Sequence, residues 1–299
     1  MRNFLYIINP VAGTRAKKDL QQYIEKRTSE ERIPFHIFPS VAGGDYSFLH
    51  SIIKEKKITD VLIAGGDGTI SQVIGSLLEF DLNFGIIPCG SGNGLAYTAK
   101  IPRQPGKALD IIFKGKAYPT DGFYINEHFA CMLCGLGFDA KVAHDFARQP
   151  RRGLATYVKQ VVRNFFRATT WSFEIGIKGK TFPAEAFFIS IANSNQFGNN
   201  FTIAPKASLS DGLLDIVIVS RQGKWSWILQ TLKQVRGKNK VVPESLVDGK
   251  KEVIYFQTEA LTIKNLTGAP LHIDGDPAET PEEIRVRINK KCFRLLQPE

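Results

Sequence analysis

The chain has 299 residues, of which 43% are hydrophobic and 23% charged, a composition typical of a globular protein large enough for two domains. The formal net charge of +10 indicates an anionic partner, whether a nucleotide, a nucleic acid or a membrane surface. Four scattered cysteines without a signal peptide indicate the reducing cytosol, and no window is apolar enough to span a membrane.

In the first part of the chain, apolar strands alternate with amphipathic helices. The residue pattern predicts strands at 4–9, 33–38, 60–64 and 82–87, and helices at about 17–27, 45–57 and 69–80. Alternation at this spacing predicts a parallel sheet that is covered by helices on both faces. Ligands of such sheets bind at the carboxyl ends of the strands.

Three glycine-rich loops each follow one of these strands and precede a helix, at residues 9–14, 65–69 and 88–94. Exposed backbone N–H groups and a helix N-terminus together favour a phosphate. Because parallel strands end at one edge, we expect the three loops to converge. Asp67 would repel a phosphate unless a divalent cation lay between them, so Mg²⁺ is expected with it. The alternative is an ordinary turn with Asp67 as the N-cap of its own helix.

Beyond about residue 117 the pattern becomes β-rich. We expect strands at 129–133, 171–177, 184–192, 213–219, 253–256, 261–263, 271–273 and 284–288, interrupted by helices near 154–166 and 225–235. This predicts a second, mostly antiparallel domain, a β-sandwich, with the boundary at residues 116–128.

Five motifs in order resemble the diacylglycerol kinase catalytic domain family, which includes bacterial lipid kinases, sphingosine kinases and ceramide kinases. They are NPVAG from Asn9, GGDGT from Gly65, GSGN from Gly90, the segment 204–215 and the segment 273–277. The resemblance implies an N-terminal nucleotide-binding α/β domain with a parallel sheet and a C-terminal β-sandwich. The ATP-binding domain would span 1–122, joined by 281–299, and the lipid-substrate domain 123–280.

The resemblance implies a phosphotransferase that uses ATP and Mg²⁺ to phosphorylate a lipid hydroxyl, with diacylglycerol favoured. The catalytic base would be Asp276, and Asp67 would organise the metal-bound nucleotide. The implied metal site comprises Ser208, Asp211 and Leu213. The implied nucleotide contacts are Asn9, Gly13, Thr14, Ser40, Gly65, Gly66, Asp67, Gly68, Thr69, Ile70, Ser71, Ser91, Gly92 and Asn93.

The sequence departs from the family pattern at three places. Asp276 stands where the family usually has Glu, and Ser71-Gln72 replaces Asn-Glu after GGDGT. Asn93-Gly94 resembles the sphingosine and ceramide kinase version of the third loop. A sphingoid-base or ceramide-type kinase, an NAD kinase-like enzyme with a soluble substrate, and a non-catalytic nucleotide or lipid sensor therefore stay open as alternatives.

Two basic segments, 146–173 and 221–240, contain aromatic residues and no acidic residue. They suit either an anionic inner membrane surface or a core-facing stripe with a solvated basic back, and the sequence leaves both open. We expect a cytoplasmic, peripherally membrane-associated protein of phospholipid metabolism that binds no nucleic acid; a homodimer is left open. Cys131 and Cys134 are interpreted as buried strand cysteines, and His144 and Asp145 as helix surface residues.

Overall fold

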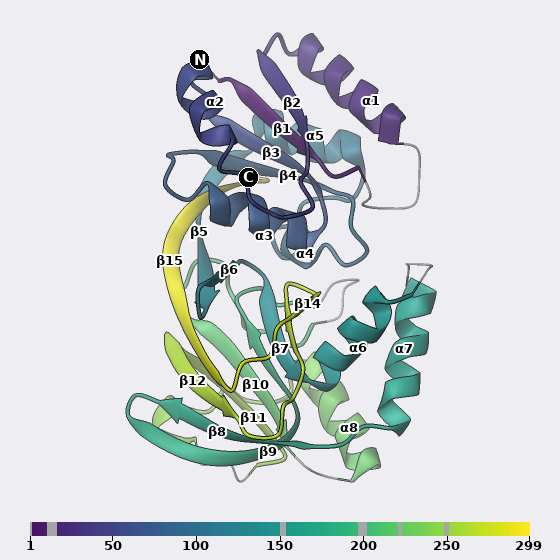
Figure 1. Cartoon of the computed structure of the whole chain (residues 1–299), viewed down its shortest axis with the longest axis vertical. Helices are drawn as coiled ribbons and strands as arrows, with labels where there is room; N and C mark the ends of the chain where they lie inside the picture. Colours follow the sequence, from purple (N-terminus) through teal and green to yellow (C-terminus); the bar gives the residue numbers. More distant parts are fainter. Residues whose placement is uncertain (1, 11–16, 150–153, 197–201, 221–222, 248–250) are drawn as a thin grey trace. The chain divides into compact units, whose positions relative to one another are not determined.

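A computed structural model describes residues 2–10, 17–149, 154–196, 202–220, 223–247 and 251–299 (Figure 1). The chain forms two compact units, Met1–Thr120 with Lys291–Glu299, and Asp121–Lys290. It passes between them twice, within β5 (Lys116–Ile125) and within β15 (Glu283–Gln297). None of the helices in the described ranges is long and apolar enough to cross a bilayer.

The first unit is built on a parallel sheet in the order β2 (Phe35–Pro39), β1 (Phe4–Ile8), β3 (Asp60–Gly65) and β4 (Asn83–Pro88). The end of β15 adds a fifth parallel strand beside β4. The predicted parallel α/β architecture is therefore confirmed. The helices are α1 (Lys17–Glu30), α2 (Leu49–Lys56), α3 (Asp67–Ser76), α4 (Gly94–Thr98) and α5 (Pro105–Lys114).

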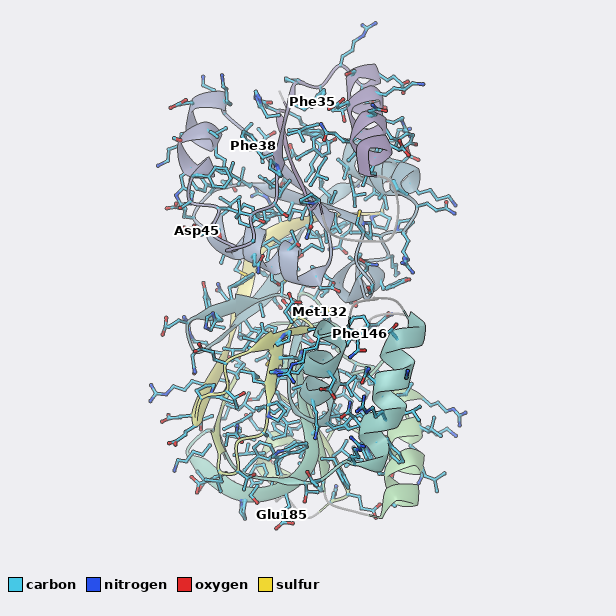
Figure 2. All side chains as sticks on the ribbon, turned by 45° about the vertical axis from the view of Figure 1, so that its right-hand side comes forward. Phe35, Phe38, Asp45, Met132, Phe146 and Glu185 are labelled. Carbon is cyan, nitrogen blue, oxygen red and sulfur yellow. The ribbon has the colours of Figure 1, made fainter. Side chains whose placement is uncertain are left out.

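Two helix boundaries in this unit differ from the expected ones. Helix α2 begins at Leu49 instead of Asp45, because the Asp45 carboxylate accepts a hydrogen bond from the Ser47 N–H (2.9 Å) and forms a turn first. Asp45 lies at the surface of the unit (Figure 2). Helix α3 begins two residues earlier than expected and ends at Ser76.

The second unit is an antiparallel sandwich whose two sheets share the long strand β9 (Lys180–Ala192). The first part of β9 pairs with β8, and its last residues pair with both β7 and β10. The predicted β-sandwich is confirmed. The strands are β6 (His128–Ala130), β7 (Leu133–Gly137), β8 (Trp171–Ile177), β10 (Leu214–Ser220), β11 (Val253–Thr258), β12 (Ala260–Asn265), β13 (Leu271–Ile273) and β14 (Asp276–Ala278), with one short 3₁₀ helix at Glu244–Leu246.

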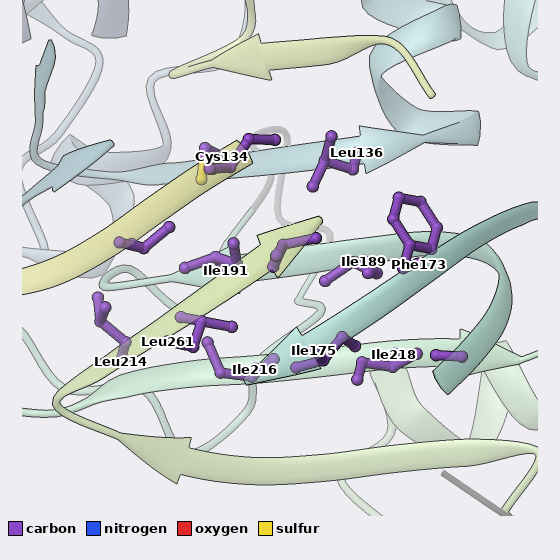
Figure 3. Close-up of a cluster of buried hydrophobic side chains, with 14 of the residues drawn as sticks. Cys134, Leu136, Phe173, Ile175, Ile189, Ile191, Leu214, Ile216, Ile218 and Leu261 are labelled. Carbon is purple, nitrogen blue, oxygen red and sulfur yellow. The ribbon is translucent and has the colours of Figure 1, made fainter. Parts of the chain in front are cut away.

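The main core of this unit lies between the two sheets (Figure 3). Alternate residues of β9 and β10 point into it, among them Ile189, Ile191, Ile216 and Ile218. Earlier in β9 the inward residues are Ala184 and Ala186, so Glu185 between them is exposed (Figure 2). A register shift between Ala186 and Phe188 changes the phase before Ile189.

A second core lies on the other face of the sheet that contains β10, under α6 (Phe138–Ala147), α7 (Leu154–Phe166) and α8 (Lys224–Val235). Trp227 is only 3% exposed and stacks on Phe187, with ring centroids 4.3 Å apart. Phe138 and Phe165 also contact it. Trp227 and Phe165, which belong to the basic segments 221–240 and 146–173, therefore face the core.

The prediction of a single strand at 129–133 is wrong, because these residues are divided between β6 and β7. The backbone N–H groups of Cys131, Met132 and Leu133 donate to the side chain of Asp274. A carboxylate from a distant segment thus interrupts the strand. Cys131 and Cys134 are buried free thiols, as expected, but only Cys134 lies in a strand, since Cys131 belongs to the interruption between β6 and β7.

Candidate functional site

The carboxyl ends of four parallel strands bring the predicted nucleotide loops together in the first unit. In the register of the sheet, Ile8 lies beside Pro39 and Ala64, and Gly65 lies beside Pro88. The loops after β1, β3 and β4 therefore begin at one edge, as does Ser40 after β2. Gly13 and Thr14 lie outside the described residues.

The strand order reverses between β1 and β3, the position where open α/β sheets bind their ligands. Asn9 lies there. Its backbone N–H donates to the Ala64 carbonyl at 2.9 Å, and its side-chain Nδ2 donates to Thr69 Oγ1 at 2.8 Å. The first two loops are thus joined through residues that the motifs singled out.

The second and third loops are in direct backbone contact. A Cβ atom added to Gly90 would lie 2.6 Å from the Cα atom of Gly66, a distance that no side chain tolerates. Asn93 has a φ of 55°, and its side chain exchanges two 2.8 Å hydrogen bonds with the backbone of Gly90. Glycine at both contact positions therefore allows the two loops to share one small space.

Asp67 joins these loops more tightly. Its carboxylate is 8% exposed and accepts hydrogen bonds from the backbone N–H groups of Gly94 (3.1 Å) and Leu95 (3.2 Å). The alternative interpretation of Asp67 as the N-cap of its own helix is wrong: Gly66 is the N-cap of α3, and Asp67 caps the start of α4. Its negative charge is thus partly compensated by backbone dipoles.

The other predicted contacts differ in accessibility. Ser91 is exposed and Gly92 half-buried, whereas Ile70 and Ser71 are buried. The side chain of Ile70 belongs to the core, so only its backbone can reach a ligand. Burial raises the pKa of Tyr46, whose hydroxyl bonds to the side chain of Ser40.

In the second unit, Asp274 and Gly275 form the turn of the hairpin between β13 and β14. Their φ values of 49° and 86° fit a type I′ turn, and Ile273 pairs with Asp276 across it. Asp274 is buried and accepts three backbone N–H bonds of 2.8–3.2 Å, so its carboxylate has a structural role. Asp276 is exposed at the start of β14.

A buried histidine–carboxylate pair lies behind this turn, and the sequence analysis did not identify it. His272 is 3% exposed; its Nδ1 accepts the Gly275 N–H at 3.3 Å, and its Nε2 lies 3.4 Å from Asp139 Oδ2. Gly135 leaves room for the pair, since a Cβ there would lie 2.7 Å from His272 Nε2. A glycine inside the apolar strand β7 was the available signal.

The predicted metal residues lie in and beside a turn just before β10. The Asp211 carboxylate accepts the Leu213 N–H at 3.1 Å, and the neighbouring Asp121 accepts the Gly212 N–H at 2.7 Å. Burial, and then the charge of Asp121, raise the pKa of Asp211. A cation would relieve this repulsion, and the oxygen-only donors fit Mg²⁺, although the described residues contain no cluster of three or more metal-binding side chains.

Next to this turn, Asp215 is completely buried. The Tyr255 hydroxyl and Gln257 Nε2 donate to its two carboxylate oxygens. Burial raises the pKa of Asp215 to about 6, although both hydrogen bonds oppose the shift. The same pairing raises the pKa of Tyr255, after the larger effect of its own burial.

Residues 3–125 match the family model described as the diacylglycerol kinase catalytic domain, and residues 133–296 match the YegS C-terminal NAD kinase beta sandwich-like domain. A diacylglycerol kinase of Bacillus subtilis (strain 168) is 26% identical over 284 residues, covering 92% of this chain and 90% of the relative. A protein named "Probable lipid kinase YegS-like" from Chromohalobacter salexigens is also 26% identical, over 86% of this chain and 82% of its own length.

The fold is likewise shared with a solved structure. The crystal structure of a diacylglycerol kinase from Bacillus anthracis str. Sterne superimposes with a TM-score of 0.71 at 19% identity, covering 99% of this chain and 97% of that one.

Proposed function

Because the chain belongs to the diacylglycerol kinase family of lipid kinases, we propose that it transfers the γ-phosphate of ATP to the hydroxyl group of diacylglycerol. Family membership gives the class of reaction, the phosphorylation of a hydroxyl group. The convergence of the loops after β1, β3 and β4 at one sheet edge is the observation that carries the nucleotide part of the proposal.

In this proposal the first unit binds the nucleotide. The N-terminus of α3 and the backbone of the glycine loops would hold the phosphates, with Asn9 and Thr69 at the point where the strand order reverses. Contact between the glycines at 66 and 90 keeps side chains out of this space. The neighbouring predicted contacts, Ser40 and Ser91, would complete the set.

Mg²⁺, when bound with ATP, neutralises charge that develops on the phosphates during transfer. Two groups of residues are assigned to cations here. Asp67 would organise the nucleotide-bound ion, although its carboxylate also holds the start of α4. Asp211, with the carbonyls of Ser208 and Leu213, would hold a second ion in the sandwich unit.

Asp276 is assigned as the general base that accepts the proton of the acceptor hydroxyl. Asp276 is exposed at the start of β14, whereas the carboxylate of Asp274 beside it is buried and accepts three backbone hydrogen bonds. The short type I′ turn and the buried His272 fix the backbone from which Asp276 projects. Positioning of this kind is the main contribution of a protein to phosphoryl transfer.

We place the working protein in the cytoplasm at an anionic membrane surface, where its lipid substrate resides. The formal charge of +10 favours such a surface. Helices α7 and α8 also expose Val162, Leu229 and Leu232 beside their basic residues. Exposed apolar side chains next to basic ones suit the membrane interface.

The test is a transfer assay with labelled ATP, Mg²⁺ and the folded full chain. Mixed micelles would each contain one lipid alcohol: diacylglycerol, a sphingoid base or ceramide. We expect label in diacylglycerol. Transfer only to a sphingoid base or ceramide would show that diacylglycerol is not the acceptor, while the protein would still be a lipid kinase. ATP binding without transfer to any lipid would favour a non-catalytic sensor.

A further inference from the structure

A cavity of about 230 Å³ lies between α6 and α7 in the sandwich unit. None of the described residues that line it is among those assigned to the nucleotide, the metal or the acceptor hydroxyl. Its lining comes from these two helices and the residues that directly follow them, and includes the buried Gln160 and Asn164 of α7. The cavity is therefore a candidate site separate from the proposed reaction.

The cavity is strongly basic. Its cations are Lys141, Arg148, Arg163 and Arg167, and none of them forms an ion pair with a carboxylate among the residues that the structure describes. One acid, Asp145, also lines the wall, and Asn164 Nδ2 donates to its Oδ2 at 2.9 Å. Four cations and one carboxylate leave a formal charge of +3. Their mutual repulsion would be relieved by an anionic ligand.

A buried amide adds a second, independent indication of a ligand. Gln160 lines the cavity and is only 2% exposed, yet its side chain forms no hydrogen bond with any described residue. The fully buried side-chain atoms without a hydrogen-bond partner do not include the Gln160 amide, so this amide keeps access to the cavity. Asn164, by contrast, already donates to Asp145 and to the Gln160 carbonyl. The amide of Gln160 is thus available to a ligand.

We propose that this cavity binds the phosphate group of a phosphate ester. A phosphate group suits the three arginines better than a monatomic anion would, because each guanidinium can donate two parallel hydrogen bonds to phosphate oxygens. The ester is either the headgroup of an anionic phospholipid or a soluble phosphate monoester. The cavity shares no described residue with the proposed kinase site, so phosphate binding there is independent of the proposed function.

The first experiment measures binding of inorganic phosphate and glycerol 3-phosphate to the full chain by titration calorimetry. Arg163→Gln and Arg167→Gln should each weaken binding about tenfold, the effect of losing one charge-assisted hydrogen bond. Gln160→Leu should weaken it several-fold without changing the net charge. Lys159→Gln is the matched control, because Lys159 is exposed on α7 and does not line the cavity; its effect should stay below about twofold.

A second arm identifies the source of the phosphate. Cosedimentation would use phosphatidylcholine vesicles with and without phosphatidic acid. If binding to the phosphatidic acid vesicles depends on Arg163 and Gln160, the ligand is a lipid headgroup. If the soluble ligands bind but substitution of these two residues does not change vesicle binding, the ligand is a soluble ester. The proposal is overturned if neither arm shows binding, or if Arg163→Gln and Lys159→Gln weaken it equally while Gln160→Leu has no effect. Thermal unfolding would verify that each variant is folded.

Discussion

The Oδ2 atom of Asp67 lies 3.1 Å from the backbone nitrogen of Gly94, so the carboxylate of one predicted phosphate loop holds the backbone of another. Asp67→Ala removes this bond and the one to Leu95. We expect the free energy of unfolding to fall by about 1–3 kcal/mol and ATP affinity to fall at least about tenfold. Urea unfolding and nucleotide titration would measure the two effects. Unchanged stability would show that these hydrogen bonds contribute nothing net.

Asp276→Asn should abolish phosphoryl transfer and leave ATP affinity nearly unchanged. The amide keeps the size of the side chain but cannot accept the hydroxyl proton. Asp276→Glu is the matched control: it restores the residue usual in the family, and substantial activity is expected. Steady-state transfer rates and a separate ATP titration would test this. Full activity of Asp276→Asn would refute the assignment of the base.

His272→Ala should lower kcat about two- to tenfold, since the Gly275 N–H loses its acceptor and the turn before Asp276 is less well fixed. The KM for ATP should not change. In His272→Asn, the amide oxygen can replace Nδ1 as acceptor and should recover part of the loss. A KM effect, or no difference between Ala and Asn, would argue for a general structural role.

Removal of Mg²⁺ by a chelator should abolish transfer. Asp211→Asn should raise the Mg²⁺ concentration needed for half-maximal activity about tenfold or more, because one carboxylate ligand is lost. Glu185→Gln, on an exposed position of β9, is the charge-matched control. A titration of activity against Mg²⁺ would decide. The same response from both variants would remove Asp211 from the proposed metal site.

The buried Asp215 should make stability depend on pH. Its pKa is about 6 in the folded protein against an ordinary value of 3.8, so between these values the folded state binds more protons than the unfolded state. Stability should therefore fall as pH rises from about 4 to 6 and level off above that. Asp215→Asn should remove this loss and raise the free energy of unfolding at pH 8 by up to about 3 kcal/mol. Any weakening of the hydrogen bond with Tyr255 would reduce this gain. Urea unfolding at pH 5 and pH 8, with a chelator present, would show whether the variant lacks this dependence.

The features that the sequence predicted are those coded locally. Continuous apolar runs identified the parallel strands of the first unit, because β1 and β3 are buried on both faces. Short β-rich apolar runs identified most strands of the sandwich. Glycine loops directly after strands predicted their common edge. The start of α2 was misplaced because the Asp45 turn competes with helix initiation.

The features that could not be predicted depend on partners far away in the chain. The division of β6 from β7 is stabilised by Asp274, 141 residues from Leu133. Asp67 caps a helix whose first residue is 27 positions later. The pair of His272 and Asp139 spans 133 residues. A hydrophobic pattern contains no information about such pairings. Only Gly135 in the apolar strand β7 indicated one of them, the pair of His272 and Asp139.

The return of β15 to the first unit has a consequence for biosynthesis. Arg294 and Leu295 pair with Asn83 and Phe84, so the outer edge of β4 is covered by residues that leave the ribosome about 200 positions later. Until then the nascent first unit displays an open strand edge, a surface prone to pairing with other chains. Chaperones should therefore be needed most between the synthesis of β4 and that of the end of β15. A chain truncated before Arg294 should keep this strand edge open permanently.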